Sequence, residues 1–263
     1  MILLEDIEIT FNKGTALGMP ALRGIRLEIP RGQFLTVIGS NGAGKSTLLN
    51  IIAGELLPDR GRLTVDGADI TRAPVHRRAR LVARLFQDPR AGICEDMSIV
   101  ENIAVASART RPRRFGFAVT GSLRKEAAAR LEVLGLGLEG RLDDRVSLLS
   151  GGQRQALSLI MATFGPAKIL LLDEHTAALD PSAADLVMKL TREVVERHGI
   201  TTMMVTHSMR QALDYGNRIV MLHQGRIMLD ISGAARASTT IDDLLRLFGT
   251  KGGEVADNEL LLG

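Results

Sequence analysis

The segment that most constrains this chain is GSNGAGKST, which runs from Gly39 to Thr47. It follows an apolar run, Gln33–Ile38, that is typical of a strand buried on both faces. A helix is expected to follow over Thr47–Ala53 and to end at Gly54. Glycines at this spacing let backbone N–H groups turn toward phosphate oxygens, and a helix N-terminus adds partial positive charge. The segment therefore predicts a phosphate-binding loop of the G-x-x-x-x-G-K-S/T type.

Two side chains of this loop carry specific chemistry toward a nucleotide. Lys45 is expected to reach the β- and γ-phosphates of ATP, and the Ser46 hydroxyl is expected to ligate Mg²⁺. A purely structural glycine turn is the alternative, and the buried strand before the loop and the helix after it argue against it. The residues expected to contact the nucleotide are Gly39, Ser40, Asn41, Gly42, Ala43, Gly44, Lys45, Ser46 and Thr47.

Buried strands and helices alternate along much of the sequence. Two further apolar runs, Lys168–Leu172 and Thr201–Val205, are separated by an amphipathic helix over Ser182–His198. Such alternation predicts an α/β fold with a mostly parallel sheet. Near the N-terminus, the alternating Ile7, Ile9 and Phe11 and the run Leu27–Ile29 predict an antiparallel β subdomain. Other short strands and turns are expected at Arg62–Val65, Asp66-Gly67, Arg218–Leu222, Gln224-Gly225 and Arg226–Asp230.

The middle of the chain has a different character. From about Asp88 to Gly165 strand signals vanish, and helical periodicity dominates in Ile99–Ala108, Leu123–Leu134 and Gln153–Thr163. This block predicts a helical subdomain, over about residues 88–164, that is inserted into a core formed by residues 1–87 and 165–249. Residues 250–263 are expected to form a flexible tail.

Composition limits the classes of function. The net charge of +3 is too small to argue for nucleic-acid binding, and the single cysteine, Cys94, excludes an internal disulfide. Neither a signal peptide nor a run of about 20 apolar residues is present, so we expect a protein that stays in the cytoplasm. Basic residues cluster in Arg72–Arg84 and Arg109–Arg114. These clusters predict either solvated surfaces or a surface facing anionic lipid or an acidic partner.

Two carboxylates follow the apolar run Ile169–Leu172. Asp173 and Glu174 lie at the carboxyl end of that predicted strand, where ligands bind in open α/β sheets. Asp173 is expected to hold the Mg²⁺ shell, and Glu174 to orient or deprotonate the attacking water. Loop carboxylates that cap a helix are the alternative. Together with the phosphate loop, the pair predicts a phosphate-loop NTPase.

A second glycine turn opens another predicted helix. In Leu149-Ser150-Gly151-Gly152-Gln153 the two glycines follow a serine and leave a helix N-terminus that suits an anion. A chain that already has a phosphate cradle needs a second one only if it supplies the ATP of a neighbouring molecule. Here the sequence resembles the ABC ATPases, whose signature is LSGGQ, over roughly residues 1–249.

The resemblance implies roles for further residues. Gln87 is similar to the family's Q-loop glutamine, which touches Mg²⁺ and links the ATP core to the helical subdomain. His207 is similar to the switch histidine that contacts the γ-phosphate. The segment Ala178–Pro181, which contains Asp180, resembles the D-loop that runs between two monomers. Phe11 resembles the aromatic residue that stacks on adenine, although its alternation with Ile7 and Ile9 also allows a core position. Nucleotide contacts from the opposite copy are assigned to Ser150, Gly151, Gly152 and Gln153.

The departure of His175 from the proline common in the family narrows the subgroup. The segment Asp173–Pro181, together with Gly216–Arg218, resembles ATPases of bacterial importers that work with a tryptophan- or tyrosine-binding lipoprotein. The resemblance implies a homodimer, a membrane permease, a lipoprotein or periplasmic partner, and a peripheral location on the cytoplasmic face of the inner membrane. For His175 itself we expect a packing or turn role. An ABC exporter, a lipid-extraction ATPase, a soluble iron–sulfur assembly subunit and a regulatory nucleotide-binding module remain alternatives.

Overall fold

A computed structural model describes residues 1–109 and 116–252 of the 263-residue chain. The chain divides into two compact units. The first unit combines residues 1–78 with the chain from Gly199 onward, and the second unit is residues 79–198. The second unit contains the predicted helical block 88–164 together with strands and a helix that flank it.

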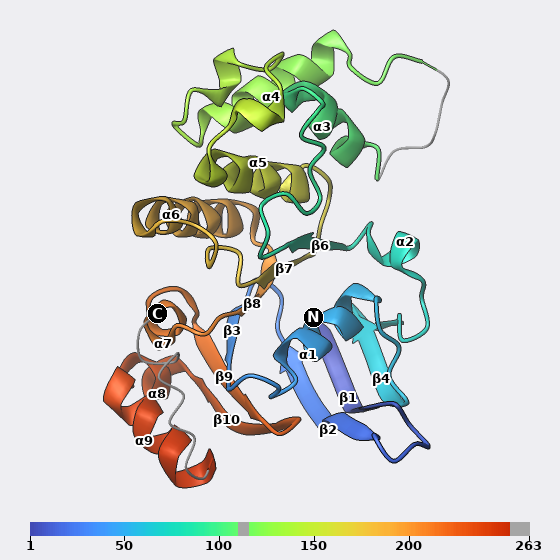
Figure 1. Cartoon of the computed structure of the whole chain (residues 1–263), viewed down its shortest axis with the longest axis vertical. Helices are drawn as coiled ribbons and strands as arrows, with labels where there is room; N and C mark the ends of the chain where they lie inside the picture. Colours follow the sequence, from blue (N-terminus) through green and yellow to red (C-terminus); the bar gives the residue numbers. More distant parts are fainter. Residues whose placement is uncertain (110–115, 253–263) are drawn as a thin grey trace. The chain divides into compact units, whose positions relative to one another are not determined.

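An antiparallel sheet occupies the N-terminal part of the first unit (Figure 1). Strand β1 (Ile2–Phe11) pairs with β2 (Met19–Ile29) on one side and with β4 (Arg60–Val65) on the other. The short strand β5 (Ala68–Asp69) pairs with β4. Asp66 and Gly67 both have positive φ, 51° and 81°, as the turn of a two-residue hairpin requires. The antiparallel strands and this turn confirm the prediction, and β2 begins earlier than expected.

Mostly parallel strands form the rest of the first unit's sheet structure. Strand β3 (Phe34–Ile38) lies between β8 (Thr201–Val205) and β9 (Arg218–His223) and runs parallel to both. Every residue of β3 and β8 is buried, because side chains cover both faces of a parallel sheet. Strand β10 (Arg226–Ser232) returns antiparallel to β9. The α/β core with a mostly parallel sheet is thus confirmed.

Helices complete the first unit. Helix α1 (Lys45–Ala53) follows β3, and α2 (Val75–Arg78) follows β5. The others are α7 (Met209–Tyr215), α8 (Gly233–Ala237) and α9 (Ile241–Gly252). Helix α9 is absent from the sequence prediction. It contributes Leu244 to a buried cluster with residues of β3, α7 and β9, namely Ile38, Met209, Ala212, Ile219 and Met221. Residues 253–263, most of the predicted tail, lie outside the described residues.

The second unit is mainly helical (Figure 1). Its two parallel strands are β6 (Val82–Leu85) and β7 (Ile169–Asp173). Its helices are α3 (Ile99–Ser107), α4 (Gly121–Glu132), α5 (Gly151–Thr163) and α6 (Pro181–His198), with 3-10 turns at Leu138–Gly140 and Val146–Leu148. Strand β6 escaped prediction because Arg84 interrupts its short apolar pattern. Most of the second basic cluster, residues 110–114, lies outside the described part.

The first basic cluster has mixed roles. Arg78 is only 1% exposed, and its guanidinium donates to the carbonyls of Ile51, Ile52, Thr71 and Ala73. Arg84 is also mostly buried, whereas Arg72, His76 and Arg77 are exposed. The cluster is therefore partly structural. Among residues 1–109 and 116–252, no helix is long and apolar enough to span a bilayer.

Candidate functional site

The phosphate loop is built on glycines that no other residue can replace without strain. Gly39, Gly42 and Gly44 have φ of 151°, 75° and 102°. A Cβ on Gly39 would lie 2.2 Å from the Leu222 carbonyl oxygen, and one on Gly44 would lie 2.7 Å from the Ala21 carbonyl oxygen. At Gly42, no described atom lies within 4 Å of such a Cβ. The loop is thus tightly packed on its inner side and open at Gly42.

Helix α1 begins without a side-chain cap. Gly44 is its N-cap residue, and no described side chain accepts a hydrogen bond there. Lys45 is 5% exposed, and its Nζ donates to the carbonyl oxygens of Gly39 at 2.6 Å and Ser40 at 3.1 Å. The loop's own carbonyls therefore hold a positive charge over the loop. This arrangement suits a polyphosphate, because it combines a cation with an uncapped helix N-terminus.

His207, the predicted switch histidine, lies at the same sheet edge of the first unit as this loop. In the parallel pair β3–β8, Val37 is opposite Val205, and the Thr206 N–H donates to the Val37 carbonyl at 3.2 Å. His207 directly follows this last contact and is partly exposed. The next residue, Ser208, caps α7. The first unit therefore brings the phosphate loop and His207 to one edge, as expected for two groups that act on one ligand.

The predicted catalytic carboxylates share a sheet edge in the second unit. Strands β6 and β7 are parallel with Leu85 opposite Leu172, so Gln87 and Glu174 both emerge two residues beyond this pair. Glu174 has a φ of 45°, which is uncommon for a residue with a side chain and points to a functional constraint. Gln87, Asp173 and Glu174 therefore leave the strands together.

An arginine that sequence reasoning missed contacts one of these carboxylates. Arg84 Nη2 donates to Asp173 Oδ2 at 2.7 Å, and the two side chains are 13% and 17% exposed. The guanidinium also lies 4.8 Å from the centre of the Phe86 ring. Arg84 therefore balances the Asp173 charge in this structure. The only sequence signal was a charged residue inside an otherwise apolar four-residue strand.

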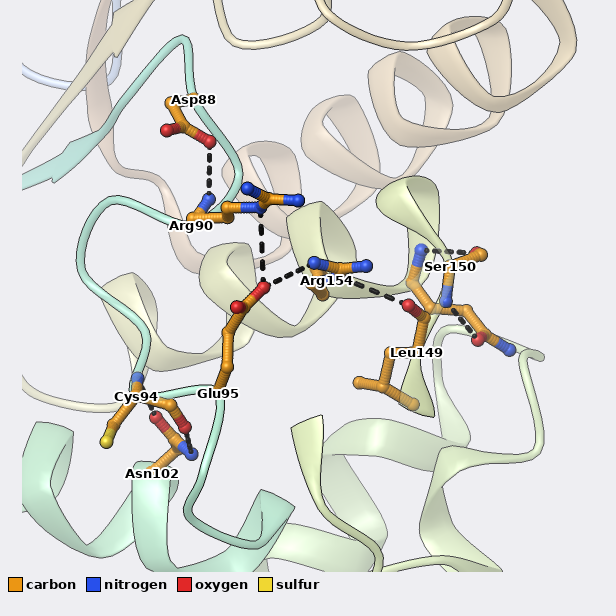
Figure 2. A network of polar contacts seen from close by, with 9 residues as sticks. Asp88, Arg90, Cys94, Glu95, Asn102, Leu149, Ser150 and Arg154 are labelled. Atoms are coloured by element: carbon orange, nitrogen blue, oxygen red, sulfur yellow. Dashed lines mark hydrogen bonds and ion pairs between the residues drawn. The ribbon is translucent and has the colours of Figure 1, made fainter. Parts of the chain in front are cut away.

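The signature segment forms the N-terminus of α5. Ser150 is the N-cap: its Oγ accepts from the Gln153 N–H at 3.2 Å, and Gln153 Oε1 accepts from the Ser150 N–H at 3.0 Å (Figure 2). This is a capping box. The two glycines permit close packing, because a Cβ on Gly151 would lie 3.3 Å from Leu179 and one on Gly152 would lie 3.0 Å from the Ala183 Cβ. The segment thus has a structural role, and its contact with the ATP of another copy stays a prediction.

Asp180 and Phe11 also have local roles. Asp180 Oδ1 accepts from Ser182 Oγ at 2.6 Å and from the Ala183 N–H at 3.0 Å, and these bonds lower the pKa of the Asp180 carboxyl. Asp180 therefore caps α6 in its ionised form. Phe11 is partly buried at the end of β1, beyond the buried core positions Ile7 and Ile9 of the alternation. Its predicted contact with adenine stays a prediction.

His175 is a packing residue. It is 1% exposed, and its Nε2 lies 3.3 Å from the Thr191 hydroxyl on α6. Burial lowers the pKa of His175 to about 4, so the imidazole is neutral at physiological pH. The Gly216–Arg218 segment, the other subgroup feature, is structural too, since Asn217 bonds the Phe34 backbone and Arg218 pairs with Asp230.

A phosphate loop between a buried parallel strand and a helix, in a chain with paired carboxylates after another strand, defines a phosphate-loop NTPase. Residues 22–177 match the ABC transporter family, and this is more than half of the chain. The chain belongs to the ABC transporter family and is one of its ATP-binding, ATP-hydrolysing proteins.

Sequence similarity to ATP-binding proteins of transporters supports this assignment. The chain is 42% identical to the tyrosine transport ATP-binding protein of Clostridioides difficile, over 94% of this chain and 98% of that protein. It is 34% identical to the phosphonates import ATP-binding protein of Thiobacillus denitrificans, over 81% of this chain and 82% of that protein. It is also 34% identical to a macrolide export ATP-binding/permease protein of Brucella abortus, over 88% of this chain but only 34% of that protein.

Solved structures agree with the fold. The dimeric post-hydrolysis ATP-binding cassette MJ0796, bound to ADP and Pi, matches 88% of this chain and 98% of its own with a TM-score of 0.74 and 27% identity. The cbiO1 protein of Clostridium perfringens, part of the cbiONQ transporter complex, matches 95% of this chain and 94% of its own with a TM-score of 0.77 and 25% identity.

Proposed function

We propose that this chain is the ATPase subunit of a bacterial importer for an amino acid of the tyrosine type. The observation that carries the proposal is the 42% identity to a tyrosine transport ATP-binding protein over nearly the full length of both chains. The His175 and Gly216–Arg218 features of the same subgroup support it. The cargo itself is recognised elsewhere, because ATPase subunits of this class act on ATP.

Two copies bind ATP head to tail in this proposal. The phosphate loop of one copy, with Lys45, and the Ser150–Gly152 turn of the other both contact each nucleotide. The dimeric ADP-bound cassette MJ0796 is the precedent that supports this arrangement. Gly151 and Gly152 are partly exposed, as backbone that must meet a second molecule requires.

The donor set of the chain fits Mg²⁺. Among the described residues, no group of three or more His, Cys, Asp or Glu side chains forms a metal site. The oxygens of Ser46, Asp173 and Gln87 are hard donors of the kind that Mg²⁺ prefers, and nucleotide phosphates supply the rest. When bound, the ion would neutralise charge on the β- and γ-phosphates. Asp173 would then divide its charge between this shell and Arg84.

Hydrolysis needs a base, a cation and a contact to the γ-phosphate. Glu174 accepts a proton from water as the water oxygen bonds to the γ-phosphorus, and the bond to the β–γ bridging oxygen breaks to release ADP. Lys45 offsets the charge on the departing oxygens, and His207 hydrogen-bonds the γ-phosphate. Loss of the γ-phosphate removes what the second copy's Ser150 turn binds, and the dimer loosens.

A groove in the second unit suits a permease segment. Its volume is about 180 Å³, and its walls come from the segment after β6, from α3 and from α5. Val105 is 60% exposed at this groove, and Met161 and Phe86 make it apolar. Two buried atoms, Gln155 Oε1 and Ser158 Oγ, have no hydrogen-bond partner among the described residues. An incoming helix with polar side chains would satisfy them. The peripheral inner-membrane location follows from this partner.

The Glu174→Gln variant tests the catalytic part. We expect ATP turnover to fall by ~10²-fold or more, because the base is lost, while ATP holds the dimer together. Light scattering with and without ATP measures the dimer. Turnover close to that of the unaltered protein would place the base at another residue.

Copurification tests the transport part. The tagged chain, isolated from detergent-solubilised membranes, should bring a permease and a substrate-binding lipoprotein with it. Uptake of labelled tyrosine by cells that lack this chain should fall. The match to a macrolide export protein makes efflux the second candidate function. A copurifying permease whose loss reduces efflux and leaves uptake unchanged would favour the exporter over the importer.

A further inference from the structure

Glu95 links the segment after Gln87 to the signature helix. Its Oε1 accepts from Arg154 Nη1 on α5 at 2.5 Å and lies 3.5 Å from Arg90 Nε (Figure 2). The backbone N–H of Arg90 in turn donates to Asp88 Oδ1 at 2.9 Å, one residue beyond Gln87. All of these residues belong to the second unit.

The loop that carries Glu95 is held in place by Asn102. This α3 residue is 2% exposed. Its Nδ2 donates to the Cys94 carbonyl at 2.9 Å, and its Oδ1 accepts from the Cys94 N–H at 2.8 Å (Figure 2). The same Nδ2 also donates to the Ser98 carbonyl at 3.0 Å. A buried amide with these bonds fixes the loop on both sides of Glu95. The carboxylate is therefore presented from a rigid support.

The same loop pairs with the chain that leads into the signature. The Ser147 N–H donates to the Glu95 carbonyl at 3.0 Å, and the Val146 N–H donates to the Met97 carbonyl at 3.1 Å. These two residues belong to the 3-10 turn Val146–Leu148, immediately before Leu149. Backbone and side chain of Glu95 thus both contact the approach to α5.

Arg154 carries the link to the signature turn itself. Its side chain is 18% exposed, and its Nε donates to the Leu149 carbonyl at 3.1 Å while Nη1 donates to Glu95 (Figure 2). Leu149 directly precedes Ser150, the N-cap residue of α5. A planar guanidinium held at two of its nitrogens has a fixed orientation. Glu95 therefore fixes the arginine that holds the start of the Ser150–Gly152 turn.

We propose that Glu95 is a positioning residue that holds the signature turn in the orientation required to contact the partner copy's ATP. The inference rests on the head-to-tail dimer proposed above. The Glu95 side chain is 37% exposed, and pairs that are this exposed contribute little to folding stability. Its effect is therefore expected in ATP-dependent dimerisation, and only slightly in thermal stability.

The test uses Glu95→Gln in the Glu174→Gln background, in the full-length chain. The Gln side chain keeps an acceptor and loses the charge that Arg90 and Arg154 share. We expect the ATP concentration for half-maximal dimer, measured by light scattering, to rise roughly tenfold, because both copies lose the link. Affinity of the monomer for ADP, measured by calorimetry, should stay within about twofold, since the phosphate loop is unaltered.

A matched control lies in the same unit. Glu126 pairs with Arg130 on α4 at 2.9 Å with similar exposure, 39% and 32%. Glu126→Gln in the same background should leave the dimerisation concentration unchanged. A double-mutant cycle sharpens the result: once Arg154→Gln is present, adding Glu95→Gln should cause no further shift. Equal shifts for Glu95→Gln and Glu126→Gln, or additive shifts in the cycle, would overturn the inference.

The outcomes separate this inference from the proposed function. If Glu174→Gln alone forms no dimer with ATP, the head-to-tail dimer is wrong and the role of Glu95 is wrong with it. If Glu174→Gln dimerises and the Glu95→Gln change leaves the ATP requirement as it was, only the inference about Glu95 fails.

Discussion

The N-termini of α1 and α5 make an instructive pair. Both helices begin at glycine-containing turns that we assign to phosphate, one in each unit. Helix α1 starts at Gly44 in a left-handed conformation, and no described side chain caps it. Helix α5 starts at Ser150 in an extended conformation, with its first turn closed by a capping box to Gln153.

The difference teaches how each turn relates to its ligand. The uncapped α1 leaves backbone N–H groups for phosphate, and Lys45 already lies over the loop. At α5 the Ser150 hydroxyl is engaged with the Gln153 N–H. A phosphate that binds there must share or displace this bond. The first turn is therefore prepared for phosphate before binding, whereas the second must give up part of its own cap to bind the phosphate that we propose another molecule presents.

Replacing Lys45 should have the largest effect. We expect Lys45→Ala to lower ATPase turnover by ~10²–10³-fold, because a charge aimed at the transferred phosphate is lost. The folded α5 cap should persist, so thermal stability should change little. ATPase assays and thermal melts of the same preparation measure the two effects. A variant that retains more than half of the activity would remove the basis for calling the α1 turn prepared.

Lowering the pH should destabilise α6, which contacts His175 through Thr191, before it affects α1. Burial lowers the pKa of His175 from 6.5 to about 4, so the unfolded chain binds more protons than the folded chain in that range. The free energy of unfolding therefore decreases as the pH is lowered. From about pH 7 to about pH 5 the loss should be about 2 kcal/mol. Hydrogen-exchange protection of α6 should decline relative to α1.

His175→Gln is the control for this acid effect. The amide is uncharged over the whole range and keeps a group that can bond Thr191. Its α6 protection should be nearly independent of pH between the same two values. If the unaltered protein and His175→Gln lose α6 protection in parallel, another group is responsible.

Two serines provide a smaller and more direct comparison. Ser150→Ala removes a cap and should lower the free energy of unfolding by about 1 kcal/mol. Ser46→Ala changes an exposed hydroxyl on the uncapped helix and should leave stability within about 0.5 kcal/mol. Urea unfolding without nucleotide measures both. Equal losses would mean that the two turns are stabilised in the same way.

The smallest effect is expected at Asp180, which caps α6. Asn is an equally good cap, so Asp180→Asn should change stability by less than about 0.5 kcal/mol, the share of the lost charge at the helix N-terminus. Urea unfolding again measures it. A loss as large as that of Ser150→Ala would show that the charge, and not the hydrogen bond, fixes the end of α6.

Sequence reasoning located the elements that carry local backbone requirements. The phosphate loop was predictable because Gly39 and Gly44 need conformations that only glycine adopts easily, and its flanking strand is uniformly apolar. The Arg84–Asp173 and Arg154–Glu95 pairs were not predictable, since their partners are 89 and 59 residues apart. Such pairs depend on the tertiary structure. Strand β6 was missed because four residues, one of them charged, give too weak a period.

Arg78 gives the phosphate loop a dependence on a residue far from it in sequence. Its guanidinium holds the last carbonyls of α1, at Ile51 and Ile52, and its aliphatic part would meet a Cβ on Gly54 at 2.8 Å. The helix that starts at the phosphate loop is consequently held at its far end by a buried cation in addition to its own backbone cap at Gly54. A substitution of Arg78 would therefore impair nucleotide binding while every predicted catalytic residue is unchanged.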